Sequence, residues 1–305
     1  MHANREKISV VIPVYNSSRY ICETIDSVND SCRDHEVEII LVDDMSGDIN
    51  IIKEMVSEYS NVRLIEKNKK SNAAHSRNIG FEKSTYDKVF FLDSDDHFTY
   101  DYVQHRLKLM NETSCGVFFG GYTVVINRKK RIQYNKVYGS GDIRDYLFLE
   151  NGDFRTSTVS INKLYHKGTL FDSEMRKHQD WGLGIRCYDA KESIYYDNQT
   201  HVMINVGRGD QMSASMNIEA SDYFINSYIV NDKHLVKFVE IHMVPAICNK
   251  DLSALKFFFN CMKKTQVTGK RKVAFFIYKI LSQKGILHFS SPMLSGMKLV
   301  KNLLK

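Results

Sequence analysis

Acidic residues follow two hydrophobic segments that have the composition of buried strands. The two groups are Asp43-Asp44, after EIILV at 38–42, and Asp93-Ser94-Asp95-Asp96, after KVFFL at 88–92. Because open α/β sheets bind ligands at the carboxyl ends of their strands, we expect these side chains to share one crevice. Crowded carboxylates repel one another unless a cation compensates, and oxygen ligands suit a hard ion. The pattern therefore predicts a site for Mg²⁺ or Mn²⁺, with open positions for substrate phosphates.

Capping of the following helices is the simpler explanation for acids at strand ends. It is credible for Asp43 or Asp48 alone, but it accounts poorly for the D-x-D-D cluster at 93–96. The chain has no G-x-x-x-x-G-K-[ST] loop and no G-x-G-x-x-G after its first strand. These absences exclude a P-loop NTPase and disfavour a dinucleotide site. Phosphate must then be bound by the metal and by basic side chains.

The elements that position these acids alternate between strand and helix signals over the first hundred residues. Apolar runs rich in β-branched residues predict strands, at 8–12, 38–42, 62–65 and 88–92. Apolar residues at helical spacing predict helices between them, and Ser17 or Ser18 is expected to cap the first helix. This β-α order predicts a doubly wound α/β layer with a parallel sheet.

Beyond about residue 113 the pattern changes. Segments 117–127 and 131–138 alternate in character and predict antiparallel strands. A helix is expected over 181–190, and the chain is mostly helical from 218 onward. We therefore expect an α/β domain over 1–216, with a mixed central sheet, and a helical C-terminal region over 217–305.

The net charge of +6, from 42 basic and 36 acidic residues, is unevenly spread. Residues 252–305 contain 11 Lys and Arg and no acid, whereas the 251 residues before them carry 31 basic and 36 acidic residues. A nucleic-acid binder would carry its basic residues on the body, so we expect no nucleic acid as partner. Basic residues around an apolar stripe at 273–281 favour an anionic membrane surface. The alternative is a helical subdomain that packs this stripe on the core.

The six cysteines form no C-x-x-C pair, which predicts reduced thiols in a cytosolic protein. The first residues have no apolar core of signal-peptide type. No run approaches the roughly 18–20 apolar residues that a membrane span requires. The expected location is therefore cytoplasmic, peripheral at the inner face of the cell membrane.

Four short motifs occur in order along the α/β part of the chain. They are IPVYN at 12–16, VDDMSGD at 42–48, AAHSRN at 73–78 and FLDSDD at 91–96. Together they resemble family 2 glycosyltransferases, and the match extends over roughly residues 6–215. The resemblance implies a GT-A fold. It also implies that a sugar moves from a nucleotide-sugar to an acceptor hydroxyl, with inversion at the anomeric carbon.

The resemblance implies a role for individual residues. Those expected to bind the nucleotide-sugar are Pro13, Tyr15, Asp44, Arg77, Asp93 and Ser94. In the family pattern Asp44 accepts a hydrogen bond from the base, Arg77 contacts base or phosphate, and Asp93 lies at the ribose. Asp95 matches the second acid of the D-x-D motif, which meets the metal and the diphosphate, and Asp96 is an additional candidate ligand.

A further family signature, usually Glu-Asp-Trp, is here Gln179-Asp180-Trp181. Gln replaces the acid, but Asp180 keeps the position of the general base, which a single displacement needs to take the acceptor proton. The alternative for Asp180 is an acid that favours a helix N-terminus. Arg208, in NVGRGDQMS at 205–213, resembles an Arg of the family that closes over the diphosphate. The alternative for that segment is a Gly-rich surface turn.

These patterns lead to one main interpretation and two alternatives. The main one is a metal-dependent inverting glycosyltransferase that uses a UDP-sugar. Its acceptor is expected to be a glycan or lipid-linked glycan in surface polysaccharide synthesis, such as O-antigen or capsule. A sugar nucleotidyltransferase should instead carry a Gly-rich loop after its first strand. A catalytically silent glycan-binding protein would not need Asp95, Asp96 and Asp180 intact.

Overall fold

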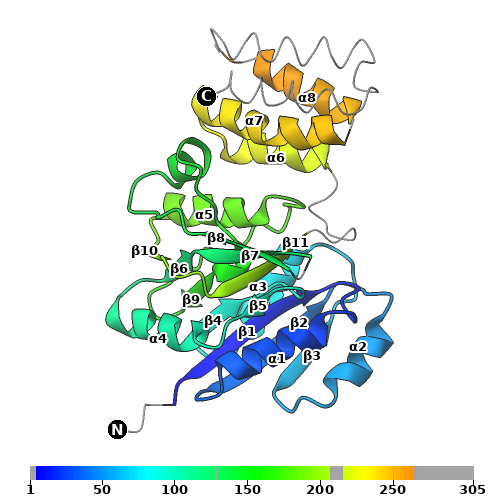
Figure 1. The fold of residues 1–305 in the computed structure, drawn as a ribbon, viewed down its shortest axis with the longest axis vertical. Helices are drawn as coiled ribbons and strands as arrows, with labels where there is room; N and C mark the ends of the chain where they lie inside the picture. The colour runs from blue at the N-terminus through cyan, green and yellow to red at the C-terminus, as the bar shows by residue number, and fades with distance from the viewer. Residues whose placement is uncertain (1–4, 128, 207–215, 250, 264, 266–305) are drawn as a thin grey trace. The chain divides into compact units, whose positions relative to one another are not determined.

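A computed structural model describes residues 5–127, 129–206, 216–249, 251–263 and 265 of the chain. The chain divides into two compact units, Met1–Leu147 with Asn151–Gln211 and Phe148–Glu150 with Met212–Lys305. The described part of the first unit is α/β and that of the second is helical (Figure 1).

The first unit contains strands, five α-helices and a 3-10 turn. Its strands are β1 (Lys7–Val14), β2 (Glu36–Asp43), β3 (Val62–Glu66), β4 (Lys88–Phe91), β5 (His97–Phe98), β6 (Val117–Gly120), β7 (Tyr122–Ile126), β8 (Lys130–Tyr134), β9 (Ser160–Asn162), β10 (Ile194–Asp197) and β11 (Val202–Val206). Its helices are α1 (Ile21–Ser31), α2 (Ile49–Val56), α3 (Ala73–Lys83), α4 (Tyr102–Glu112) and α5 (Gln179–Asp189), and the turn is η2 (Thr156–Thr158). A short π-helix, η1 (Asp145–Leu149), begins in this unit.

The main sheet has seven strands in the order β10-β6-β9-β4-β1-β2-β3. All neighbours are parallel except β9, which lies antiparallel between β4 and β6. The mixed central sheet that the sequence predicts is therefore confirmed. Because β1, β2 and β4 run side by side in parallel, their carboxyl ends reach the same edge and present the predicted acids there.

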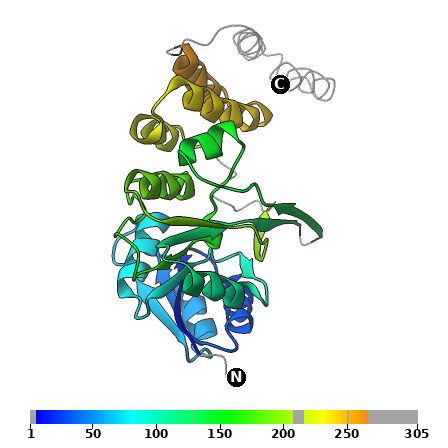
Figure 2. The ribbon, with the colours of Figure 1, turned by 90° about the vertical axis from the view of Figure 1, so that its left-hand side faces the viewer.

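Helices cover both faces of the sheet (Figures 1 and 2). Side chains alternate between the faces of a strand, so Val10 and Ile12 of β1 lie on the face that packs in one buried cluster with α1 and α4. Val11 faces the other way, against Gly80 of α3. A Cβ atom on Gly80 would lie only 2.2 Å from Val11 Cγ1, so only glycine lets α3 approach β1 this closely.

A second sheet has four strands in the order β5-β11-β7-β8. Its strands alternate along the chain with those of the main sheet. The predicted strand over 117–127 is in fact two strands, because the chain leaves the main sheet at Gly121 and continues as β7. The antiparallel pairing that we expected is confirmed for β7 with β8, whereas β6 is antiparallel to β9 and parallel to β10. A Cβ atom on Gly121 would meet the Gln199 carbonyl oxygen at 2.8 Å.

The second unit consists of α6 (Ile218–Tyr228), α7 (Asp232–Cys248) and α8 (Leu252–Lys263), together with Phe148–Glu150. Its core is aromatic: Phe224 stacks on Phe238 with ring centroids 5.1 Å apart, and the His242 ring lies 4.2 Å from that of Phe238. None of the described helices is both long and apolar enough to cross a bilayer. The basic, apolar-striped segment at 273–281, predicted to meet a membrane, lies outside the described residues.

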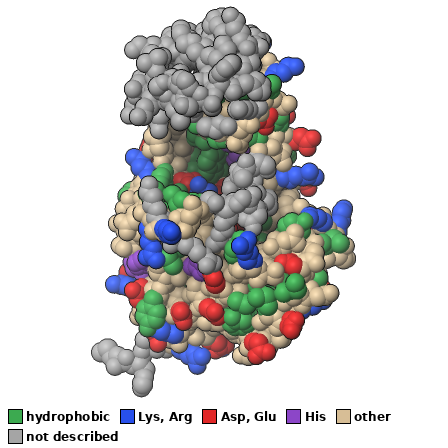
Figure 3. Space-filling view, turned by 45° about the vertical axis from the view of Figure 1, so that its right-hand side comes forward, with side chains coloured by type: hydrophobic (Ala, Val, Ile, Leu, Met, Phe, Trp, Pro, Cys, Tyr) green, Lys and Arg blue, Asp and Glu red, His purple; other side chains and the backbone are tan. Residues whose placement is uncertain are grey.

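Charged side chains of both signs lie on one face of the described surface. Figure 3 shows acidic and basic side chains interspersed over the face of the molecule that it presents. This mixture agrees with a body in which acidic residues slightly outnumber basic ones.

The expected Ser17 or Ser18 cap is wrong. Helix α1 begins at Ile21 with Tyr20 at the N-cap, and no side chain caps it. The Ser17 carbonyl instead accepts hydrogen bonds from the Tyr20 and Ile21 amides, which forms a turn before the helix. The Ser17 hydroxyl is thereby left to contact Ser94 Oγ at 2.8 Å, across to the loop after β4.

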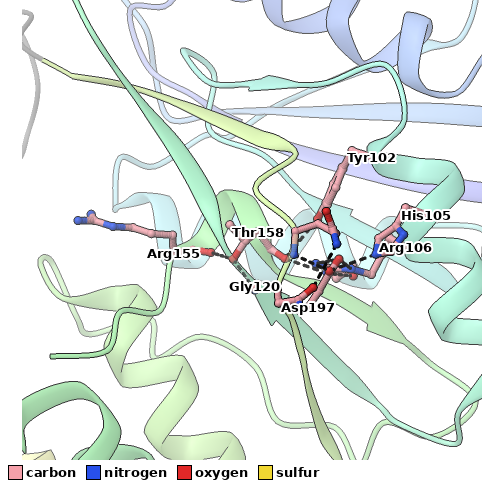
Figure 4. A network of polar contacts seen from close by, with 10 residues as sticks. Tyr102, His105, Arg106, Gly120, Arg155, Thr158 and Asp197 are labelled. Atoms are coloured by element: carbon pink, nitrogen blue, oxygen red, sulfur yellow. Dashed lines mark hydrogen bonds and ion pairs between the residues drawn. The ribbon is translucent and has the colours of Figure 1, made fainter. Parts of the chain in front are cut away.

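A buried ion pair fixes the centre of the first unit (Figure 4). Arg106 of α4 is 1% exposed, and its Nη2 and Nε atoms donate to Asp197 Oδ2 at 3.2 and 3.3 Å. Its Nη1 atom donates to the Thr158 carbonyl at 3.0 Å and to Ser160 Oγ at 2.8 Å. His105 Nε2 lies 3.2 Å from the second Asp197 oxygen. One guanidinium thus joins α4, η2, β9 and the end of β10.

Replacing Arg106 with Met should lower the free energy of unfolding by about 3–5 kcal/mol, because Asp197 would remain buried without its partner. Urea denaturation measures the effect. Lys108→Met on the same helix is the matched control, since its pair with Glu112 is 3.9 Å long and exposed. That control should change stability by less than about 1 kcal/mol. Equal losses in the two variants would contradict a special role for the buried pair.

Candidate functional site

The predicted nucleotide wall is formed by the ends of β1 and β2. Pro13 is buried and pairs in register with Val42, whereas Tyr15, just past the strand, is 44% exposed. The Lys70 ammonium lies 3.5 Å from the centre of the Tyr15 ring, as in a cation–π contact. An exposed aromatic ring beside a cation is a suitable surface for a base carrying phosphates.

Asp44 lies beneath this wall and is largely buried. Its Oδ1 atom accepts from Lys67 Nζ at 2.7 Å and from the Ser71 amide at 2.7 Å. Lys67 is itself nearly buried and also donates to Ser76 Oγ at 3.1 Å. The Lys67 ammonium therefore balances the Asp44 charge and fixes the carboxylate. A fixed carboxylate at this position can accept a hydrogen bond from a base N–H.

The acids of the loop after β4 differ in their exposure to solvent. Asp93 and Asp95 are partly exposed, and the Ser94 carbonyl accepts from Thr24 Oγ1 at 2.9 Å. Asp96 is 4% exposed, and its two oxygens accept from the Asn205 amide at 3.0 Å and from Ser157 Oγ at 2.6 Å. Burial raises the pKa of Asp96 well above its ordinary value, and the Asp95 and Asp93 charges add to this effect.

The donor set bears on the predicted metal ion. Within the described residues, no group of three or more His, Cys, Asp or Glu side chains has a metal-binding arrangement. A Mg²⁺ or Mn²⁺ ion that also binds substrate phosphates needs only one or two protein carboxylates. Asp95 is partly exposed and fits that requirement. Asp96, with both oxygens accepting from protein donors, fits it poorly.

Arg77 of α3 connects the strand ends to the second half of the site. The guanidinium is buried; its Nη2 atom donates to Asp93 Oδ1, and its Nη1 atom donates to Gln179 Oε1 at 2.8 Å. Gln179 is buried as well and anchors itself through Nε2 to the Met175 carbonyl at 2.8 Å. Gln179 therefore holds Arg77 through a neutral amide. The two motifs around 93 and 179 are joined although 86 positions separate them.

Asp180 lies in the first turn of α5, where the helix dipole favours an acid. The helix starts after His178, which adopts the left-handed conformation with φ 62° and ψ 26°. A non-glycine residue in that region is uncommon and is often found at functional sites. The His178 ring stacks on Trp181, with centroids 5.6 Å apart.

The surroundings of Asp180 raise its pKa. Burial raises the pKa of this carboxyl to about 6, the nearby Arg155 guanidinium opposes the shift, and the Asp153 charge adds to it. The Trp181 amide donates to Asp180 Oδ1 at 3.0 Å and favours the ionised form, as Arg77 does. A carboxylate with a pKa near the working pH is well suited to accept a proton in a reaction.

The sequence analysis missed three residues of this region: Asp153, Arg155 and Ser157. Asp153 accepts hydrogen bonds from Trp181, Arg155 and Tyr122. Ser157 donates a hydrogen bond to Asp96. They lie between a π-helix and a short strand, where no hydrophobic periodicity marks an element. The only signal is a mostly polar segment, DFRTST at 153–158, before β9.

The structure thus brings most of the predicted site residues together. Pro13, Tyr15 and Asp44 lie at neighbouring strand ends, Ser94 contacts the turn after β1, and Arg77 joins Asp93 to the start of α5. Arg208, predicted to close over the diphosphate, lies outside the described residues. The roles of these residues remain predictions.

The Asp180 carboxyl should titrate with a midpoint near pH 6, about two units above the ordinary value for aspartate. Carbon-13 NMR of aspartate-labelled protein measures this midpoint, and the signal missing from Asp180→Asn identifies the residue. A midpoint below about 4.5, closer to the ordinary value, would show that the site does not shield this carboxyl from water.

Comparison with known proteins identifies the family of this chain. The family model described as "Glycosyl transferase family 2" matches residues 9–173, which is more than half of the chain. An uncharacterised glycosyltransferase of Haemophilus influenzae is 30% identical over 236 residues, covering 75% of this chain and 90% of its own length. The amylovoran biosynthesis glycosyltransferase AmsB of Erwinia amylovora is 32% identical over 190 residues, covering 59% of this chain and 63% of the relative.

Solved structures agree on the fold. The crystal structure of S. aureus TarS residues 1–349 in complex with UDP-GlcNAc superimposes with a TM-score of 0.56, covering 88% of this chain and 83% of that one. At 17% sequence identity this likeness concerns the architecture, which is of the GT-A type. The family match favours a glycosyltransferase over a sugar nucleotidyltransferase. The chain belongs to glycosyl transferase family 2.

Proposed function

We propose that this glycosyltransferase transfers a sugar from a nucleotide-diphosphate sugar to an acceptor hydroxyl with inversion, with Asp180 as the general base. The observation that carries the proposal is the Arg77 bridge between Asp93 and Gln179. It ties the acids at the strand ends, where a nucleotide-sugar would bind, to the helix turn that presents Asp180. A single displacement requires both parts around one anomeric carbon.

The chain's own residues would hold the donor at the strand ends. Tyr15 provides an exposed ring for the base, and the Asp44 carboxylate, fixed by Lys67, would accept from a base N–H. Asp93, held by Arg77, would face the ribose. Ser94 is fixed by Ser17 and Thr24, and this rigidity supports a defined donor pose.

Asp180 would take the proton of the acceptor hydroxyl as its oxygen attacks the anomeric carbon. The bond to the new oxygen forms as the bond to the diphosphate breaks, so the configuration inverts and no covalent enzyme intermediate is needed. With a pKa of about 6, Asp180 is mostly ionised at neutral pH and still basic enough to accept a proton.

A divalent cation would be held by Asp95 and by the donor diphosphate, with Asp96 supporting the loop from below. Such an ion would stabilise the negative charge that develops on the leaving diphosphate. Metal dependence is part of the proposal, and Mg²⁺ and Mn²⁺ both suit an oxygen site of this kind.

The names of similar proteins support a substrate class. The AmsB relative is a glycosyltransferase of amylovoran biosynthesis, and the TarS neighbour was crystallised with UDP-GlcNAc. We propose that this chain likewise uses a UDP-sugar and extends a cell-surface polysaccharide on a glycan or lipid-linked acceptor. Docking of the basic C-terminal segment on an anionic membrane remains a prediction from its sequence.

Asp180→Asn should bind UDP with unchanged affinity but lose about 10²–10⁴-fold in turnover, because the amide cannot take a proton. Turnover with water as the acceptor is measured as the rate at which UDP is released from UDP-GlcNAc and from other UDP-sugars. Titration calorimetry with UDP measures binding. Wild-type turnover in this variant would remove Asp180 from the role of base.

Asp95→Ala should weaken only the metal-dependent part of donor binding. The affinity of the wild-type protein for UDP should increase when Mn²⁺ is added, and the variant should lose most of that increase while keeping its metal-free affinity. Asp101→Ala, which changes an acid just before α4, is the control for a general loss of charge. An identical Mn²⁺ effect in wild type and Asp95→Ala would contradict ligation by Asp95.

A further inference from the structure

We propose that Asp153 is a positioning residue for the base, holding the Trp181 indole and the Arg155 guanidinium and thereby fixing both the orientation and the charge around Asp180. This inference rests on the proposed function of Asp180. It assigns a role to a segment, 153–158, that carries no recognised motif.

Asp153 is a buried carboxylate with four donors, and it is 9% exposed. Its Oδ1 atom accepts from Trp181 Nε1 at 2.9 Å and from the Phe154 amide at 3.0 Å. Its Oδ2 atom accepts from Tyr122 Oη at 2.6 Å and from Arg155 Nε at 2.7 Å. A buried carboxylate with this many directional donors has one orientation only.

The contact to Trp181 fixes the first turn of α5. Trp181 follows Asp180 in the chain, and its amide donates to the Asp180 carboxylate. The indole is held at one end by Asp153 and along its face by the His178 ring. The Asp153 contact therefore restrains the backbone at 178–181. We infer that this restraint helps to orient Asp180.

The contact to Arg155 sets the charge near the base. Arg155 lies close enough to lower the pKa of Asp180, while the Asp153 charge raises it. Arg77 is the other charged group that acts on Asp180, and it lowers the pKa less than Arg155 does. Asp153 accepts from Arg155 Nε, the guanidinium carbon lies 5.7 Å from the centre of the Tyr122 ring, and the Arg155 side chain is 45% exposed. Asp153 thus keeps the Arg155 cation beside Asp180 and partly neutralises the charge of that cation.

Two variants, each of which removes one charge, separate this role from a merely structural one. Asp153→Asn removes a negative charge and leaves Arg155 unbalanced, so the Asp180 titration midpoint should fall. Arg155→Met removes the cation, so the midpoint should rise. Each shift should be about one pH unit, the usual effect of one nearby charge. Carbon-13 NMR of the Asp180 carboxyl measures both shifts without any substrate.

The pH dependence of UDP-sugar hydrolysis should follow the same order. The acid limb of kcat should move to lower pH in Asp153→Asn and to higher pH in Arg155→Met. Trp181→Phe removes the indole donor without a charge change, so kcat should fall while the Asp180 midpoint stays in place. Asp189→Asn is the control, because it weakens the ion pair between half-exposed Asp189 and buried Arg144 at the other end of α5, about 14 Å along the helix from Asp180.

The outcomes distinguish the two proposals. Shifts of the Asp180 midpoint in the same direction, or no shifts, in folded Asp153→Asn and Arg155→Met would overturn the role of Asp153. Opposite NMR shifts with no change in the hydrolysis profile would support the electrostatic coupling but remove Asp180 as base. If Asp153→Asn does not fold, Arg155→Met and Tyr122→Phe still test the network, and Tyr122→Phe should leave the midpoint within about half a unit of wild type.

Discussion

The Arg106 charge is buried in the middle of the α/β unit, and the rest of the site depends on how that charge is balanced. Asp197 supplies the counter-charge from the end of β10, and the Thr158 carbonyl completes the shell. Arg106 therefore holds the 3-10 turn η2 through the Thr158 carbonyl. In the same turn Ser157 donates a hydrogen bond to Asp96, and just before the turn Asp153 accepts one from Trp181. One desolvated guanidinium thus fixes the segment that contacts both halves of the site.

Charge is distributed in the site so that few carboxylates face one another. Asp44 is paired with Lys67, Asp93 with Arg77, and Asp96 accepts two neutral donors below the surface. Asp95 and Asp180 are the two acids to which the proposed function assigns the metal ion and the proton. Gln179, where the family usually has Glu, fits this arrangement, because an amide satisfies Arg77 without adding another negative charge next to Asp180. The departure from the motif therefore has an electrostatic reason in this chain.

The sequence predicts the grouping of residues at the strand ends well and the surroundings of Asp180 only in part. Strands β1, β2 and β4 are continuous apolar runs, and their ends carry the motif residues, so periodicity and the sheet rule suffice to place Asp44 and Asp93 together. The burial of Asp96 cannot be predicted from the sequence, because nothing local distinguishes it from the adjacent Asp95. Its hydrogen-bond partners, Ser157 and Asn205, lie on distant segments of the chain. Asp153 has the same difficulty, since its partners are 28 and 31 positions away and lie on elements that form no common pattern with it.

The single antiparallel strand of the main sheet has a consequence for how the molecule is assembled. Strands β1, β2 and β3 pair in chain order, whereas β4 pairs with β1 through Ile8 and Lys88, 80 positions apart, and β9 pairs with β4 through Lys88 and Asn162, 74 positions apart. Closing so long a loop costs entropy before its contacts form, so local β-α pairs tend to form earlier. The part formed by β1, β2 and β3 can then exist before β4 and β9 are added to it. Completion of the candidate site would be a late event in folding, because Asp93 follows β4 and Ser157 precedes β9.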